Sequence, residues 1–154
     1  MGYAQTGGYG TGGAPQLAST GDPPAQKELA AGDPAHLEHN VSRLIHEGYK
    51  LDSEGRFGTR TSFQASEIVT DHPNELAKHF FNELGRGGKP VSVNTPNGKI
   101  EMRVFDGGSR IGLRPITRSS RMSGNDNPAV DITIKISSIR QNRYYKLHFH
   151  SKGE

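Results

Sequence analysis

The 154-residue sequence contains no cysteine and no tryptophan, and only 31% of its residues are hydrophobic. The lack of cysteine excludes disulfides, zinc–thiolate sites and a thiol nucleophile. No apolar run has the length of a membrane span, and the start of the chain lacks the apolar core of a signal peptide. We therefore expect one small domain that does not cross a membrane.

The first 30 residues account for much of the low hydrophobic content. Glycine and proline occur throughout them, and no apolar period is visible. Such a segment cannot bury enough surface to offset the entropy lost on ordering. We predict that residues 1–30 are a flexible linker that adds little stability and joins the domain to a longer polypeptide. Residues 31–154 would then form a single domain.

Charge is distributed unevenly along the chain. Residues 1–85 carry a net charge of −5, whereas residues 86–154 carry +8. A basic block of this kind favours a polyanionic partner, most often a nucleic acid. The alternative interpretation is a charged surface that only keeps the domain soluble.

Two segments in the first half have the apolar spacing of helices. The first, 33–48, begins with Asp33-Pro34 and ends in glycine, and the second, 71–85, begins with Asp71-His72-Pro73 and also ends in glycine. Asp is a favoured N-cap, proline is tolerated at the first helical position, and glycine ends many helices. Residues 49–70 are ambiguous and allow a third, short helical segment at Gln64–Val69.

After about residue 90 the apolar period changes from helical spacing to alternation. Alternating residues separated by turn-forming sequences predict strands at 91–93, 100–104, 111–113, 130–136 and 143–150. Short loops between most of these strands favour antiparallel pairing. The sequence therefore predicts an α+β domain, in which N-terminal helices (33–85) pack on a twisted antiparallel sheet of four to five strands (90–150).

The last strands present different residues on their two faces, because side chains alternate along a strand. The predicted core face takes Val130, Ile132, Ile134, Ile136, Tyr145, Leu147 and Phe149. The opposite face takes Arg114, Asp131, Thr133, Lys135, Tyr144, Lys146, His148 and His150. The second set holds the residue types that catalysis needs, although a solvated face with no chemistry is the alternative.

A segment rich in arginine and hydroxyl groups precedes strand 130–136. It contains the cations Arg118 and Arg121 and the hydroxyls of Thr117, Ser119 and Ser120. Arginine can hold a phosphate by two parallel hydrogen bonds, and hydroxyls can donate to its oxygens. We expect this loop to be a phosphate-binding wall beside the sheet.

These residues suit cleavage of RNA, which carries its own nucleophile in the 2′-OH. His148 titrates near neutral pH and can act as a base or an acid. Lys146 and Arg114 can stabilise the charge of the phosphorane. The scheme needs no metal ion and no cofactor. Asp131 has two open roles: it orients or neutralises a cation, or it caps the loop by accepting backbone N–H groups.

Two stretches, GLRPITRSSRMSGNDNPAVDITI and YYKLHFH, resemble the C-terminal toxin domains of bacterial contact-dependent growth inhibition and related polymorphic toxin systems. Such domains have the barnase–EndoU–colicin–RelE fold, which includes the colicin D-like tRNases. The resemblance implies functional roles for Arg114, Thr117, Ser119 or Ser120, Asp131, Lys146 and His148. The choice between the two serines stays open because Arg118 and Arg121 flank them.

The resemblance also implies a biological setting. The domain would be a monomeric, metal-independent ribonuclease that cuts tRNA and is blocked by a cognate, acidic immunity protein. A larger secreted or cell-surface polypeptide would deliver it to the cytoplasm of a target bacterium. Residues that would contact the substrate are Arg118, Arg121, Thr133, Lys135, Tyr144 and His150. A non-catalytic RNA-binding module and a protein-interaction domain with an acidic partner are the alternatives.

Overall fold

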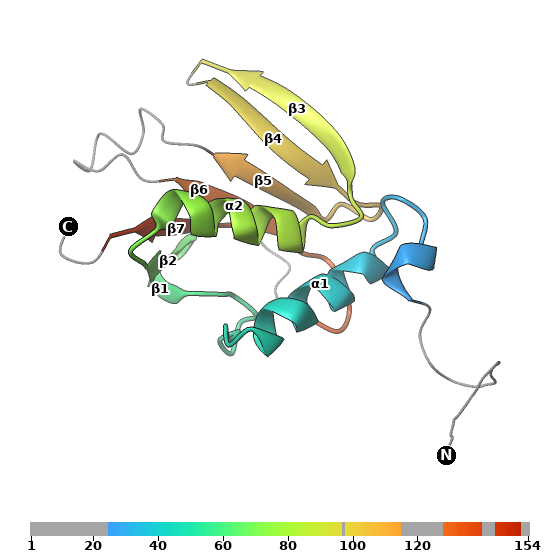
Figure 1. Ribbon diagram of the computed structural model, residues 1–154, viewed down its shortest axis with the longest axis horizontal. Coiled ribbons are helices and arrows are strands. Elements are labelled where there is room, and N and C mark those ends of the chain that lie inside the picture. Colours follow the sequence, from blue (N-terminus) through green and yellow to red (C-terminus); the bar gives the residue numbers. More distant parts are fainter. Residues whose placement is uncertain (1–24, 97, 115–127, 140–143, 152–154) are drawn as a thin grey trace.

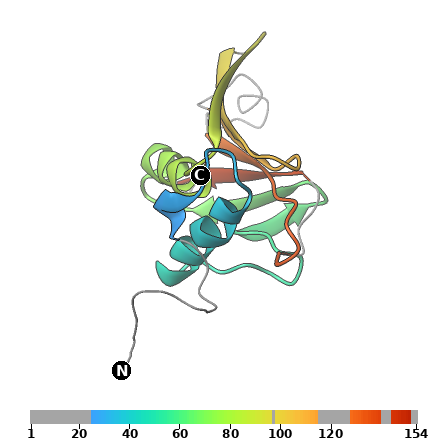
Figure 2. The same ribbon diagram turned by 90° about the vertical axis from the view of Figure 1, so that its right-hand side faces the viewer.

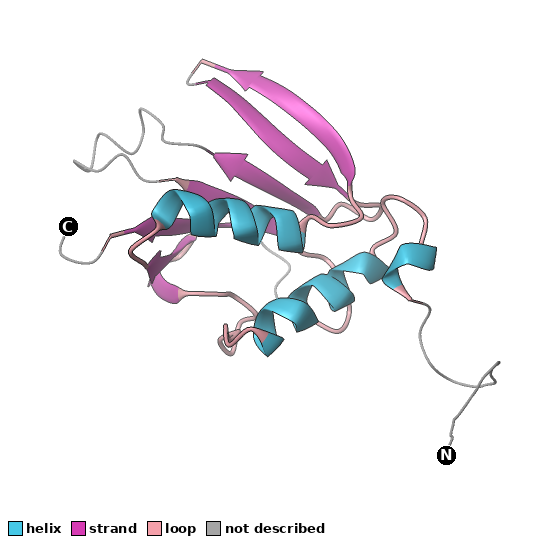
Figure 3. Ribbon diagram, in the orientation of Figure 1, coloured by secondary structure: helices cyan, strands magenta, loops and turns pink. Residues whose placement is uncertain are grey.

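The computed structural model describes residues 25–96, 98–114, 128–139 and 144–151. Figure 1 shows the helices on one side of a single strongly twisted sheet, and Figure 3 separates the two kinds of element by colour. The elements in chain order are the 3-10 helix η1 (Gln26–Glu28), α1 (Ala35–His46), β1 (Thr59–Ser62), β2 (Ala65–Val69), α2 (Pro73–Leu84), β3 (Lys89–Thr95), β4 (Gly98–Val104), β5 (Arg110–Arg114), β6 (Ala129–Thr133) and β7 (Tyr145–His150).

The predicted α+β class is confirmed, but the sheet is larger than expected. It has seven strands in the order β1-β2-β7-β6-β5-β4-β3, instead of four to five. The sheet is mixed, because β2 and β7 run parallel while the other neighbouring pairs run antiparallel. The strand that comes last in the described chain therefore lies inside the sheet.

The two additional strands come from the ambiguous stretch 49–70. A helical segment at Gln64–Val69 is wrong, because β2 occupies these residues and pairs with both β1 and β7. Ile68 packs against the core, and the β-branched residues Ile68 to Thr70 suit a pleated strand. The pairing is made with a distant part of the chain, so local sequence carries only a weak signal for it.

The predicted helices are confirmed, together with the residues that begin and end them. The Asp33 carboxylate accepts a hydrogen bond from the Ala35 backbone N–H at 2.9 Å, and Pro73 is the first residue of α2. Gly48 follows α1 with a φ of 113°, a conformation that other residues adopt with strain. Within the described ranges, no helix is long and apolar enough to cross a membrane.

The core lies between the helices and one face of the sheet, as Figure 2 shows from the side. At its centre Phe80 of α2 contacts the rings of Tyr49, Phe57 and Phe149, with centroid distances of 4.8, 5.5 and 5.4 Å. Six of the seven residues of the predicted core face are buried: Val130, Ile132, Ile134, Tyr145, Leu147 and Phe149. The seventh, Ile136, is partly buried against the same cluster.

The β3–β4 hairpin extends beyond the helices, as Figures 1 and 2 show. Met102 pairs with Gly112, which pairs with Asp131, so the apolar row of the hairpin lies on the face of the sheet that the helices leave open. The pairing of Val91 with Met102 and of Val93 with Ile100 places these four side chains on that face. Val91 and Val93 are exposed to solvent. The alternation predicted the two strands correctly, although it does not mark a row of side chains that faces the helices.

Residues 25–30 differ from the predicted linker, because they pack against α1. The side-chain amide of Gln26 donates to Asn40 Oδ1 at 2.6 Å, and the Arg43 guanidinium donates to Gln26 Oε1. His36 Nε2 lies 2.9 Å from the Ala30 carbonyl oxygen. Asn40 and His36 are buried. These contacts indicate that the ordered domain begins before residue 31.

A truncation series tests this boundary. A chain that begins at Ala31 loses the Gln26 contacts of Asn40 and Arg43 and the Ala30 carbonyl partner of the buried His36, and an unsatisfied buried polar group costs about 1–3 kcal/mol. We therefore expect its free energy of unfolding in urea to fall by at least about 1 kcal/mol. The matched control is a chain that begins at Ala25, which should unfold like the full chain. Equal stability of the two shortened chains would show that η1 contributes nothing.

Candidate active site

Strands β5, β6 and β7 bring four of the predicted residues together on the open face, which we define as the face of the sheet turned away from α1 and α2. Asp131 of β6 lies directly opposite Lys146 of β7. In the neighbouring row, Ala129 lies between His148 of β7 and Arg114 of β5. Directly opposed residues in antiparallel strands have their Cβ atoms about 4.5–5.5 Å apart, so these side chains are neighbours.

Asp131 is the centre of a hydrogen-bonded group. Its Oδ2 accepts a hydrogen bond from Arg114 Nε at 2.6 Å, and its Oδ1 accepts one from the Tyr144 hydroxyl at 2.7 Å. Only 14% of the Asp131 side chain is exposed. Of the two roles considered for Asp131, this geometry matches the orientation of a cation. Asp131 therefore holds the guanidinium of Arg114 through its Nε.

Tyr144 is held in its protonated form. Burial raises the pKa of its hydroxyl, and the adjacent negative charge of Asp131 and the hydrogen bond to that carboxylate raise it further. The phenol therefore stays a donor to Asp131 across the physiological pH range. Tyr144 acts here as a fixed support for Asp131.

Lys146 lies opposite Asp131 without forming an ion pair with it. Both carboxylate oxygens of Asp131 already accept hydrogen bonds from Arg114 and Tyr144. Across residues 25–96, 98–114, 128–139 and 144–151, the structure shows no salt bridge to Lys146. Lys146 is half-buried on the open face, where its ammonium group is available to an anionic ligand.

His148 is two residues further along β7, about 7 Å from Lys146 along the strand. Burial lowers the pKa of its imidazole, and the positive charge of Lys146 lowers it further, while Asp131 and Glu67 act in the opposite direction. The lowered pKa favours the neutral ring, which can accept a proton.

A titration of His148 tests these electrostatics without any assay of activity. We expect the His148 Cε1–H resonance to titrate below the ordinary histidine pKa, and Lys146→Gln to raise that pKa because a neighbouring positive charge is removed. Since the folded pKa is lowered, the unfolded chain takes up the proton first as the pH falls, so this site destabilises the fold in acid. Lys99→Gln on β4 is the control. An unchanged or lower pKa in Lys146→Gln would contradict the assigned coupling.

His150 continues the row along β7 but binds a different partner. Its Nε2 lies 2.8 Å from Glu67 Oε1, and its Nδ1 lies 3.4 Å from the Ser151 carbonyl oxygen. Glu67 belongs to β2, directly beside His148 in the parallel pairing. The sequence analysis missed Glu67 because its stretch allowed a helix. The structure places His150 as a partner of Glu67 at one end of the site.

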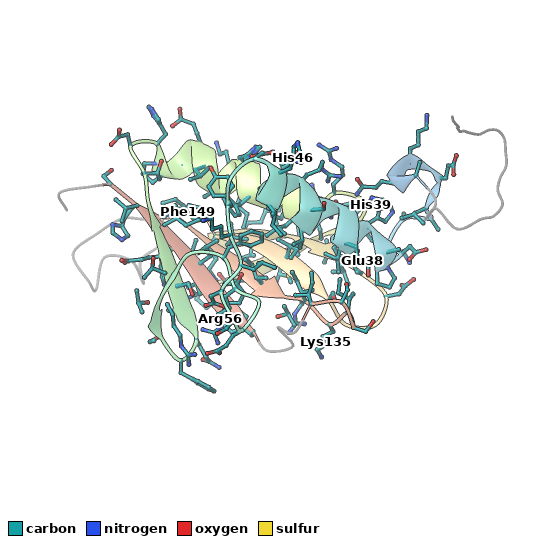
Figure 4. The ribbon with its side chains drawn as sticks, turned by 90° about the horizontal axis from the view of Figure 1, so that it is seen from below. Glu38, His39, His46, Arg56, Lys135 and Phe149 are labelled. Atoms are coloured by element: carbon teal, nitrogen blue, oxygen red, sulfur yellow. The ribbon has the colours of Figure 1, made fainter. Side chains whose placement is uncertain are left out.

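Two residues predicted to contact substrate are set apart from this group. Thr133 lies on the open face but is only 6% exposed, so its hydroxyl is covered. Lys135 follows the end of β6, and its backbone N–H donates to Ser109 Oγ at 2.7 Å. Figure 4 shows Lys135 at the opposite end of the sheet from Phe149, the neighbour of His148. The structure therefore places neither residue in the group around Asp131, and Lys135 lies beyond the end of β6 at Thr133.

The remaining predicted residues lie outside the described ranges. They are Thr117, Arg118, Ser119, Ser120 and Arg121. Among the residues that the structure does describe, no group of three or more histidine, aspartate or glutamate side chains could hold a metal ion. The described part of the candidate site therefore consists of Arg114, Asp131, Tyr144, Lys146 and His148, with Glu67 and His150 at its margin.

Comparison with protein-family models, with curated proteins and with solved structures finds no match to this chain.

Proposed function

We propose that this domain is a metal-independent ribonuclease of the bacterial toxin type, which cleaves tRNA and is neutralised by an acidic immunity protein. One observation carries the enzymatic part of the proposal. His148, with a lowered pKa, lies next to Lys146, a lysine without a carboxylate partner in the described chain, on the same sheet face as the fixed Arg114–Asp131 pair. This combination places a base, His148, and two cations, Lys146 and Arg114, around the position that we propose for the RNA phosphate. The resemblance of residues 110–149 to toxin tRNases supports the substrate and the partner.

The reaction uses the 2′-OH of RNA as the nucleophile. Neutral His148 takes the 2′-OH proton while O2′ forms a bond to the adjacent phosphorus. The bond from phosphorus to the 5′-oxygen breaks, and that oxygen takes a proton from water. The products are a 2′,3′-cyclic phosphate and a free 5′-hydroxyl. Proton abstraction requires the neutral imidazole, which the lowered pKa of His148 favours.

The cations stabilise the charge that develops on the phosphorane. Lys146 contributes a point charge beside His148, and Arg114 contributes a planar guanidinium whose orientation Asp131 fixes. Tyr144 donates to the second oxygen of Asp131 and so fixes the orientation of the carboxylate. Asp131 and Tyr144 therefore act as positioning residues in this scheme.

Incubation with tRNA in EDTA tests the proposal. We expect discrete fragments that end in a 2′,3′-cyclic phosphate, because the scheme uses only protein side chains and the substrate's own hydroxyl. Loss of cleavage in EDTA, or fragments with 5′-phosphate ends, would contradict the mechanism. A protein that binds RNA in a salt-dependent manner but never cleaves it would support the alternative of a non-catalytic RNA-binding module.

A further inference from the structure

The turn between β1 and β2 presents an aromatic side chain to solvent. Phe63 is 57% exposed, which makes it the most exposed of the large hydrophobic side chains in the described part of the protein. Exposure of a phenyl ring forgoes the stabilisation that burial gives. An exposed aromatic ring next to cationic side chains is the arrangement on which proteins stack the bases of single-stranded RNA.

A buried arginine fixes the backbone of this turn. Arg56 is only 3% exposed, and its Nη2 donates to the Phe63 carbonyl oxygen at 2.6 Å. Its Nη1 lies 3.5 Å from the Ser62 carbonyl oxygen, and its guanidinium lies 5.2 Å from the centroid of the Tyr145 ring. Figure 4 shows Arg56 beside the β1–β2 hairpin. Burial of a guanidinium is costly, and here it holds the turn that carries Phe63.

The turn adjoins the candidate active site through the parallel pairing of β2 with β7. The Lys146 backbone N–H donates to the Gln64 carbonyl oxygen at 2.9 Å, and Ala65 is the register partner of Lys146. Phe63 therefore precedes the partner of Lys146 by two residues, about 7 Å of extended chain. Tyr145, which stacks on Arg56, is the residue before Lys146 in β7.

From this arrangement we infer that Phe63 is a stacking platform for an unpaired base of the RNA, next to the phosphate that Lys146 and Arg114 bind. This inference rests on the proposed ribonuclease function. Proteins that bind single-stranded RNA stack bases on aromatic side chains beside cationic groups that follow the backbone. Arg56 is then a positioning residue, which sets the place of the ring from the core side of the sheet.

Binding measurements in an uncleaving background test the platform. The probe is a fluorescein-labelled uridine octanucleotide, and the protein is the full chain with His148→Ala. Loss of a stacking contact corresponds to about 5- to 150-fold weaker binding, so we expect Phe63→Ala to raise Kd by that factor. Phe63→Leu should be nearly as weak because it lacks a π-face, whereas Phe63→Trp should restore the affinity. Val93→Ala, an exposed apolar residue on β3, should leave Kd unchanged.

An octanucleotide of abasic residues separates stacking from other effects. Phe63→Ala should not weaken its binding, because there is no base to stack. Equal loss for both probes, or full affinity in Phe63→Leu, would overturn the platform. An effect of Phe63→Ala only on the complex with a protein inhibitor would also overturn it and would assign Phe63 to a protein interface. Thermal unfolding of each variant identifies any that fail to fold. If Phe63→Ala fails to fold, the comparison of Phe63→Leu with Phe63→Trp still tests the platform.

The outcomes distinguish this inference from the ribonuclease proposal. If the wild-type chain never cleaves RNA but its binding depends on Phe63, the ribonuclease function is wrong. The stacking contact of Phe63 with bound RNA would then stand, without the role beside a cleavage site that the ribonuclease proposal gives it. If the wild-type chain cleaves tRNA and Phe63→Ala cleaves it at the same kcat/KM, the platform is wrong and the ribonuclease proposal stands.

Discussion

His148→Ala should lower the rate of RNA cleavage by about 10²–10⁴-fold, the usual contribution of a general base. The protein should stay folded, since His148 lies on the open face and the core residues of β7 are Tyr145, Leu147 and Phe149. Affinity for RNA should be largely kept, because Lys146 and Arg114 are unchanged. Single-turnover cleavage of tRNA and thermal unfolding, measured on the same preparation, check both parts.

Two other histidines provide matched controls for this experiment. His72 is exposed at the start of α2, so His72→Ala should cleave at the normal rate. His150→Ala should cost less than His148→Ala, because His150 binds Glu67 and has no part in proton abstraction in the proposed scheme. Normal cleavage by His148→Ala would show that the site assignment is wrong. An unfolded His148→Ala protein would show that the imidazole is structural, and His148→Gln would then test the chemistry.

Phe80→Ala should destabilise the domain by about 3–5 kcal/mol, the range observed when a buried aromatic side chain is truncated to alanine. Phe80 is fully buried and contacts three other rings, which come from the segment after α1, the segment before β1, and β7. Loss of the ring leaves a cavity where these separate parts of the chain meet. Chemical denaturation of the wild-type and variant proteins measures the difference.

Ile45→Ala is the control for Phe80→Ala. Ile45 is a large apolar residue on the other helix, but it is 45% exposed. Its truncation should change the free energy of unfolding by no more than about 0.5 kcal/mol, as is usual for surface positions. A loss for Phe80→Ala of the same small size would mean that the aromatic cluster does not hold the helices on the sheet.

The helices and most strands could be predicted because their signals are local. Asp33 and Pro73 begin helices by rules that involve only adjacent residues, and the alternation in β5 to β7 reports one buried face. The β1–β2 hairpin could not be predicted in this way. Its strands are short, β1 is exposed along its length, and its stabilising partner β7 lies far away in the sequence.

The candidate site shows the same division between local and distant information. Arg114, Asp131, Lys146 and His148 were placed on one face by alternation alone. Alternation does not show where a strand ends, so Lys135 was included although β6 stops at Thr133. Glu67 was missed because it reaches the site only through the parallel pairing of β2 with β7, and Phe63, the inferred platform, adjoins the site through the same pairing.

The interior position of β7 also determines the order in which the fold can form. Until residues 145–150 are in place, the β1–β2 hairpin has no neighbouring strand, and the remaining sheet ends at β6. Contacts between segments so distant in sequence close large loops and slow folding. During synthesis the earlier segments emerge from the ribosome first. The pairing of β7 with β2 and β6 is therefore the step that brings Lys146 and His148 beside Glu67, Asp131 and Arg114.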